Sequence, residues 1–180
     1  MDYASRDLRE EHEGILFGLK ILEKMANLLR EKGNVAVADT KDMIAFFQVF
    51  ADKCHHGKEE GFLFPAMEKY GISRENGSIG QKLREHAEGR KYIAQMVDAA
   101  NSGLETGDFA DVARHYIDLL RRHIDKENNV LFPLGDKKIP PDVQAELLES
   151  FEKYEAEVMG SGTHERLHTL LKAFEKKYLS

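Results

Sequence analysis

One eleven-residue pattern occurs twice in this chain: His-x-x-Lys-Glu-x-x-x-Leu-Phe-Pro. The copies occupy positions 55–65 and 123–133, with six of eleven residues identical and no gap. Residues four apart lie about one turn apart on the same face of an α-helix. Each copy therefore places an imidazole beside a carboxylate, and each such pair could supply half of a metal site. The two pairs are His55 with Glu59 and His123 with Glu127.

The spacing of apolar residues predicts helices along most of the chain. Apolar residues make up 42% and charged residues 32%, with only four prolines, which is typical of a helix-rich globule. Strand patterns are nearly absent, while apolar residues recur at alternating spacings of three and four. Helices are expected at about 8–29, 39–65, 83–104 and 108–133, and shorter ones at about 142–158 and 163–178. The Leu-Phe-Pro ends are expected to be apolar anchors and helix stops.

These segments predict an all-α fold, an up-and-down four-helix bundle with two additional C-terminal helices. We expect one domain over residues 1–180, with a bundle core at about 3–134 and a helical extension at about 139–180. The midpoint between His12 and His55 is position 33.5, and the midpoint between His86 and His123 is position 104.5. Both midpoints fall in predicted glycine-containing turns, so each pair should face across its hairpin at one level.

If the two hairpins pack about a pseudo-twofold axis, four histidines and two glutamates converge inside the bundle. A histidine on an apolar seam is more often a hydrogen-bonded core residue than a ligand. Buried carboxylates one turn from buried histidines are costly, however, unless something pairs with them, and a dication is a suitable partner. The repeated arrangement therefore favours a site for two metal ions. Its six expected ligands are His12, His55, Glu59, His86, His123 and Glu127.

Charge and hydropathy exclude several classes of partner. The net charge of −6 argues against nucleic acid, whose phosphates attract a basic face. Nowhere do eighteen apolar residues run together, and the first residues lack the apolar core of a signal peptide, so no membrane partner is expected. A single cysteine, Cys54, fits a reducing compartment. We expect a cytoplasmic protein whose partners are a small diatomic ligand or peroxide and, as an oligomer, a second copy in a homodimer.

His12, the Glu85-His86 pair and the two repeated segments together resemble the hemerythrin-like family. Its HHE cation-binding domains are four-helix bundles that hold a non-haem di-iron centre, and the resemblance covers roughly residues 8–134. It implies two iron ions joined by an oxo or hydroxo bridge. The terminal ligands that it implies are His12, His55, His86 and His123, with Glu59 and Glu127 as bridging ligands. Imidazole and carboxylate ligands also suit manganese or zinc, so iron rests on the resemblance.

Two departures distinguish the chain from the oxygen carriers of that family. Those proteins place a second histidine one turn after the ligand of their third helix, where this chain has Arg90. They also use His-x4-Asp on the last helix, where this chain has His123-x3-Glu127. The resemblance therefore points to members linked to sensing, to peroxide or nitric oxide chemistry, or to iron-centre repair. Open positions on redox-active iron would bind dioxygen, peroxide or nitric oxide.

Four further residues are candidates for the surroundings of the centre. His56 and Glu60 form a second pair four apart, rotated about 100° from the first, and a register shifted by one would make them the ligands instead. Only His55 and Glu59 match His123 and Glu127 together with the following Leu-Phe-Pro, so we expect His56 in a supporting or surface position. Arg90 could pair with a carboxylate of the centre or occupy a would-be coordination position, or its long side chain could simply extend to the rim. Tyr116 lies two turns before His123 on the same face, where it could line a channel, although a core position is the more common outcome.

Three other classes of function compete with this prediction. The first is a zinc metalloprotease, because residues 164–168 satisfy the pattern His-Glu-x-x-His of these enzymes. No histidine follows the pattern to complete the zinc ligand set. His164 and His168 are therefore candidates for an auxiliary metal site or a polar patch. A ferritin-like oxidase would use four glutamates and two histidines, the inverse of the ratio here. An iron-handling or iron-centre repair module, which donates or senses iron, is the main alternative to a protein that binds or reacts with an oxidant.

Overall fold

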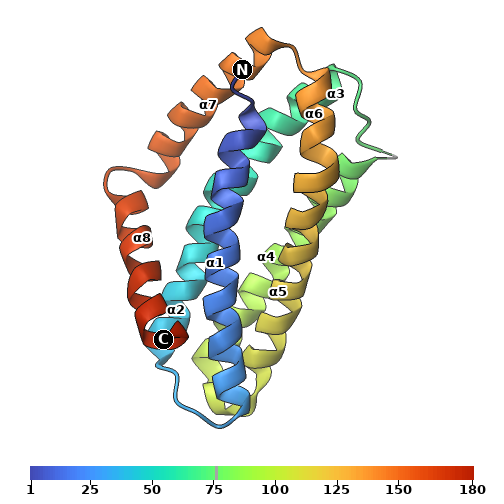
Figure 1. Ribbon diagram of the computed structural model, residues 1–180. Helices are drawn as coiled ribbons and strands as arrows, with labels where there is room; N and C mark the ends of the chain where they lie inside the picture. The colour runs from blue at the N-terminus through green and yellow to red at the C-terminus, as the bar shows by residue number, and fades with distance from the viewer. Residues whose placement is uncertain (76) are drawn as a thin grey trace.

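The structure is a computed structural model that describes residues 1–75 and 77–180, and within these residues it contains helices and no strand. Four long helices run up and down as a bundle (Figure 1). The second helix joins α2, η1, η2 and α3, and the fourth helix joins α5, η4 and α6. The bounds are α1 (Ala4–Arg30), α2 (Val37–Phe46), η1 (Phe47–His56), η2 (Glu59–Leu63), α3 (Phe64–Lys69), α4 (Ser78–Ser102), α5 (Asp108–Lys126), η4 (Glu127–Leu131) and α6 (Phe132–Lys138). This confirms the predicted all-α bundle.

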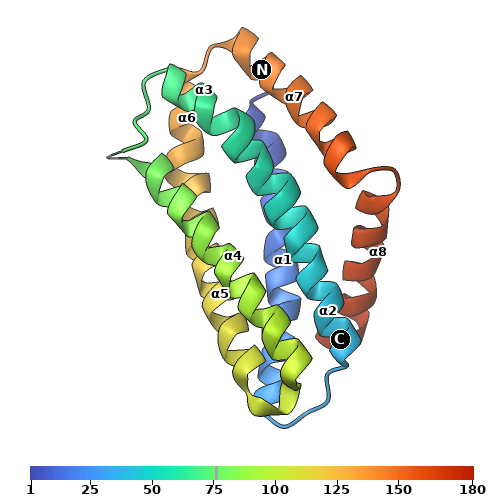
Figure 2. The ribbon, with the colours of Figure 1, turned by 180° about the vertical axis from the view of Figure 1, so that it is seen from behind.

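The turns within the two hairpins lie where the sequence predicts them. In the first, Lys32 adopts a positive φ of 59° just after α1. In the second, the short turn η3 (Leu104–Thr106) separates Gly103 and Gly107, whose φ angles are 123° and 85°. Side chains with a Cβ rarely adopt these angles, so glycine allows α4 and α5 to reverse tightly. The reversal places the two helices side by side in opposite directions (Figure 2).

The C-terminal segment forms two further helices, as predicted. They are α7 (Pro141–Met159) and α8 (Thr163–Phe174), and η5 (Glu175–Leu179) extends the latter. They run along the outside of the bundle beside α1 and the second helix (Figures 1 and 2). Tyr154 of α7 contributes to this packing because its hydroxyl donates a hydrogen bond to the carbonyl oxygen of Lys53 at 2.7 Å. The extension thus covers the hairpin that contains the first copy of the repeat.

Two apolar clusters fill the interior, one on each side of the predicted site. The larger cluster contains Ile15 and residues beyond it on α1, while the smaller contains Leu8. His12 lies between them, and His55 and His86 lie between the clusters in the same way, while His123 lies at the edge of the larger cluster, which includes Ile124. The hydrophobic effect therefore stabilises the bundle on both sides of a narrow polar layer. The packing of the two clusters keeps the histidines of this layer at the same height in the bundle.

The prediction that Leu-Phe-Pro stops each helix is wrong. The second helix continues past Pro65 to Lys69, and the fourth continues past Pro133 to Lys138. A π-helical turn precedes each proline, namely η2 and η4. Such wide turns change the hydrogen-bond register, and each proline lies in the first turn of the α-helical segment that follows, where its missing N–H is tolerated. The prediction of apolar anchors is correct, since both leucines and both phenylalanines are buried.

Candidate metal centre

The six predicted ligands converge in the buried polar layer. His12, His55, His123, Glu59 and Glu127 are 0% exposed, and His86 is 1% exposed. The rings face each other across the hairpins as the midpoint arithmetic predicts. The centroids of His12 and His55 are 4.7 Å apart, and those of His86 and His123 are 4.8 Å apart.

Each glutamate spans both hairpins. Glu59 places Oε1 3.2 Å from Nε2 of His55 and Oε2 3.1 Å from Nε2 of His86. Glu127 repeats the arrangement, with Oε1 3.1 Å from Nε2 of His123 and Oε2 3.1 Å from Nε2 of His12. One oxygen of each carboxylate therefore faces a histidine of its own helix, and the other oxygen faces the opposite hairpin. Such an arrangement suits a carboxylate that bridges two cations.

The described residues contain two groups whose ligand atoms lie within 4.8 Å of one another. We name them the first and the second site. The first site consists of His12, His55, Glu59 and Glu127, and the second site consists of His56, Glu59, His86 and His123. Glu59 belongs to both groups, and Glu127 also reaches the second site through its contact with His123.

The Nδ1 atoms of three ligand candidates have hydrogen-bond partners that the sequence does not predict. Glu11 accepts from His55 at 3.2 Å, and Glu85 accepts from His123 at 3.2 Å. Nδ1 of His12 lies 2.7 Å from Oδ1 of Asn128. With its proton on Nδ1, each imidazole keeps the lone pair of Nε2 for a cation, and the partner fixes the orientation of the ring.

Two of these three partners, Glu11 and Glu85, belong to a shorter pattern that also occurs twice in the sequence. Glu11 and Glu85 each precede a ligand candidate, in Glu11-His12 and Glu85-His86. The histidine of each pair faces the centre, while the glutamate holds a histidine of the adjacent helix. The recurrence of the Glu-His pair was the signal in the sequence that could have identified both glutamates.

Two buried lysines support these carboxylates, and here the two halves differ. Lys58, from the first copy of the repeat, is 0% exposed and lies 3.2 Å from Glu11, with Asp7 and Glu155 each at 3.1 Å. Its counterpart Lys126 is exposed. In the second half, Lys82 of α4 pairs with Glu85 instead. The sequence pattern therefore predicted the ligand positions more completely than it predicted their supports.

The ligand candidates fit a metal centre because several of their polar atoms are buried without a partner in the protein. Nε2 of His55, both oxygens of Glu59 and Oε1 of Glu127 are buried without a hydrogen-bond partner. In addition, Nε2 of His86 lies only 3.2 Å from Nε2 of His123, and two lone pairs at that distance require a proton or a cation between them. Buried polar groups without partners are costly. A pair of cations would satisfy all of these atoms at once.

The charged groups of the cluster shift one another's pKa values. Burial alone would lower the pKa of His55, but Glu59 and Glu11 outweigh burial and raise it to about 10. Burial opposes the same shift at His123, where Glu127 and Glu85 raise the pKa to about 9. Without a metal, protons on these imidazoles therefore balance the carboxylates, and a cation must displace those protons to bind.

The four candidates for the surroundings have distinct positions. His56 is buried rather than superficial, and burial together with His86 lowers its pKa to about 3. Glu60 lies 3.7 Å from Nδ1 of His86, beyond hydrogen-bond distance, and pairs with Arg90. Arg90 also contacts Asp52, so it pairs with carboxylates outside the predicted ligand set. Tyr116 is 1% exposed in the larger apolar cluster, and its ring packs edge-on against Phe47.

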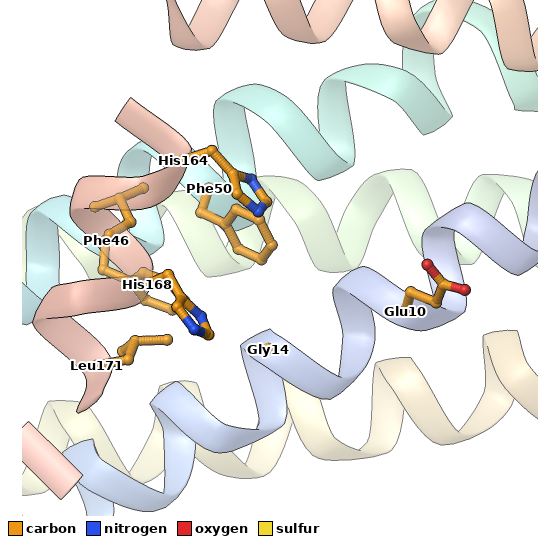
Figure 3. Close-up of a pocket in the computed structure, with 8 residues that line it drawn as sticks. Glu10, Gly14, Phe46, Phe50, His164, His168 and Leu171 are labelled. Atoms are coloured by element: carbon orange, nitrogen blue, oxygen red, sulfur yellow. The ribbon is translucent and has the colours of Figure 1, made fainter. Parts of the chain in front are cut away.

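The C-terminal histidines lie away from this centre. Figure 3 shows His164 and His168 directed from α8 toward Phe50 and Gly14, at a pocket of about 190 Å³. Nδ1 of His164 is 3.5 Å from a carboxylate oxygen of Glu155. Neither histidine belongs to the two groups of potential ligands found among the described residues. A metal ion at this pocket remains a prediction from the sequence pattern.

Comparison with known proteins identifies one family. The model of the hemerythrin HHE cation binding domain matches residues 4–135, which include all six predicted ligands but not α7 and α8. No curated protein and no solved structure matches the chain. Among the described residues, no helix is both long enough and apolar enough to cross a membrane.

Proposed function

Because the chain belongs to the hemerythrin HHE cation-binding domain family, we propose that it is a non-haem di-iron protein that binds, senses or reacts with a small oxidant. The oxidants that fit are dioxygen, peroxide and nitric oxide. One observation carries the proposal: Glu59 and Glu127 each face a histidine of either hairpin through separate carboxylate oxygens. A mononuclear site would not need two carboxylates arranged in this way.

Each residue would have a defined role in such a centre. His12 and His55 would bind the ion of the first site, His86 and His123 would bind the ion of the second, and both glutamates would bind both ions. Glu11 and Glu85 would hold the imidazoles of His55 and His123 in the correct orientation. Bound iron would supply redox chemistry and coordination positions that the protein leaves open. The apolar clusters on both sides would restrict the entry of water.

The alternative is a module that donates or senses iron, or that repairs iron centres. Such a role requires that the metal leave the protein readily. Here the ligand candidates are 0 to 1% exposed and several have hydrogen-bonded supports. Burial of this kind favours a retained metal over a donated one, so we rank this function second.

Rapid mixing of the iron(II)-loaded protein with each oxidant separates the two functions. We expect at least one oxidant to change the visible absorption of the iron in a saturable manner, while the iron stays bound. A matched control is the protein with His164→Ala and His168→Ala, which should react like the wild type. If none of the three oxidants changes the spectrum, and a chelator removes the iron on the same timescale, the iron-handling function is correct instead.

A further inference from the structure

The structure brings His56 to the metal centre, although the repeat favours its neighbour His55 as the ligand. A residue adjacent to His55 on a helix should point about 100° away from it. In the structure, however, His56 is only 4% exposed, and its ring stacks on His86 with centroids 3.8 Å apart. Its ring also lies edge-on to His123, with centroids 5.4 Å apart. His56 thus reaches the second site, within the common 4.8 Å distance of that group.

Neighbouring polar groups hold the imidazole of His56 in place. Nδ1 lies 3.4 Å from Oδ1 of Asp52, one turn earlier on the same helix. Asp52 is held in turn by Nε of Arg90, at 2.9 and 3.1 Å from its two oxygens. Since Nδ1 faces Asp52, Nε2 is the nitrogen that remains for a cation. A carboxylate on one imidazole nitrogen and a metal on the other is a recurring arrangement in metal sites.

We propose that His56 is a third imidazole ligand of the ion in the second site, so that five histidines hold the centre. This inference rests on the proposed di-iron function and deepens it. The ion of the second site would have three histidines, His56, His86 and His123, whereas the ion of the first site would have only His12 and His55. The centre would be asymmetric even though the repeat that builds it is nearly symmetric.

The asymmetry gives the two ions different numbers of protein ligands. Both bridging glutamates contribute to both ions, so the difference in histidines leaves the first ion with one more open position than the second. Arg90 has a positioning role in this arrangement, because it orients Asp52 and Asp52 orients His56. The arginine on α4 thus supports a histidine of the second helix.

Cobalt(II) provides a test that does not depend on activity. In the NMR spectrum of the cobalt-loaded protein, each bound imidazole should give one strongly shifted, exchangeable N–H signal. We expect two cobalt ions per chain and five such signals in the wild type. In the His56→Gln variant we expect four signals and binding of one cobalt ion that is weaker by about tenfold or more. The matched control is His115→Gln, which replaces an exposed histidine of α5 and should behave like the wild type.

The outcomes distinguish this inference from the proposed function. Two ions with only four signals in the wild type would overturn the role of His56 and leave the dinuclear centre intact. Fewer than two ions in the wild type would overturn both. Because the wild-type count requires no substitution, the test remains decisive even if the His56→Gln variant does not fold.

Discussion

At the scale of single residues, the supports of the imidazoles decide how firmly a metal would be held. The six expected ligands could be read from the sequence because the repeat and the two hairpin midpoints specify them. Glu11, Glu85 and Asn128 were not predicted, since their hydrogen bonds depend on how adjacent helices face each other. For the same reason, the sequence predicts only a supporting or surface position for His56, whereas the structure buries it beside His86. Helical periodicity places a residue on a face but does not say what packs against that face.

The contact between Glu85 and His123 predicts the effect of a substitution outside the ligand set. In Glu85→Gln, the charge that holds Nδ1 of His123 is lost, so we expect metal binding to weaken about 10- to 100-fold. Glu88→Gln is the matched control, because Glu88 is exposed one turn further along α4 and accepts a hydrogen bond from Tyr92. Competition with a chelator measures both affinities. Equal affinities in the two variants would contradict a supporting role for Glu85.

At the scale of helices, the π-helical turns account for what the sequence did not reveal. The helices were predicted correctly because they follow from the spacing of apolar residues. The turns were predicted correctly because glycine adopts backbone angles that other residues rarely adopt. The continuation past Pro65 and Pro133 was not predicted, because a wide turn before each proline has no simple sequence signature. Each such turn begins at a bridging candidate, Glu59 or Glu127. The irregular geometry thus coincides with the centre in both halves.

Two glycines of the second helix predict opposite effects of the same substitution. A Cβ on Gly57 would lie 2.1 Å from the hydroxyl oxygen of Tyr154, whereas a Cβ on Gly61 would meet nothing within 4 Å. Gly57→Ala should therefore lower the free energy of unfolding by about 1–3 kcal/mol, because the Tyr154 ring must move and its hydrogen bond to the carbonyl oxygen of Lys53 is lost. Gly61→Ala should raise it by about 0.5–1 kcal/mol, because alanine favours a helix.

Urea denaturation of the metal-free protein measures both changes. A Gly57→Ala variant as stable as the wild type would show that the Tyr154 ring does not pack closely against Gly57. Loss of stability in Gly61→Ala would show that this part of the helix requires a glycine for a reason other than space.

At the scale of the whole molecule, folding buries histidines and carboxylates together in one layer between two apolar clusters, although polar groups of this kind are costly to bury. The duplication predicted this convergence because two copies of one hairpin, packed about a pseudo-twofold axis, bring equivalent residues together. It could not predict that Lys58 is buried while Lys126 is exposed. That difference arises because α7, which lies outside the repeat, supplies Glu155 to Lys58 alone.

The coupled charges predict how metal binding depends on pH. The pKa values of His55 and His123 in the folded, metal-free protein are about 10 and 9, above the usual value of about 6.5. Protons on these groups therefore stabilise the metal-free fold below pH about 6.5, and this contribution is lost as the pH rises through about 9 to 10. Metal ions compete with the same protons. Metal affinity should accordingly increase as the pH rises from 7 toward 9.

Calorimetry at pH 7 in buffers of different ionisation enthalpy measures this proton release. We expect about two protons to be released when the centre is filled, one from each of these histidines. Binding without proton release, or an affinity that does not change with pH, would contradict the charge distribution described for the cluster.

The most direct test of the central claim is the metal content of the protein. It should be purified without an affinity tag after expression in iron-replete medium, and mass spectrometry should give the moles of each metal per chain. We predict about two irons per chain, falling sharply in the His55→Ala, His123→Ala double variant. A single zinc per chain that survives those substitutions, but is lost with His164→Ala and His168→Ala, would contradict the account. The metal would then belong to the C-terminal histidines.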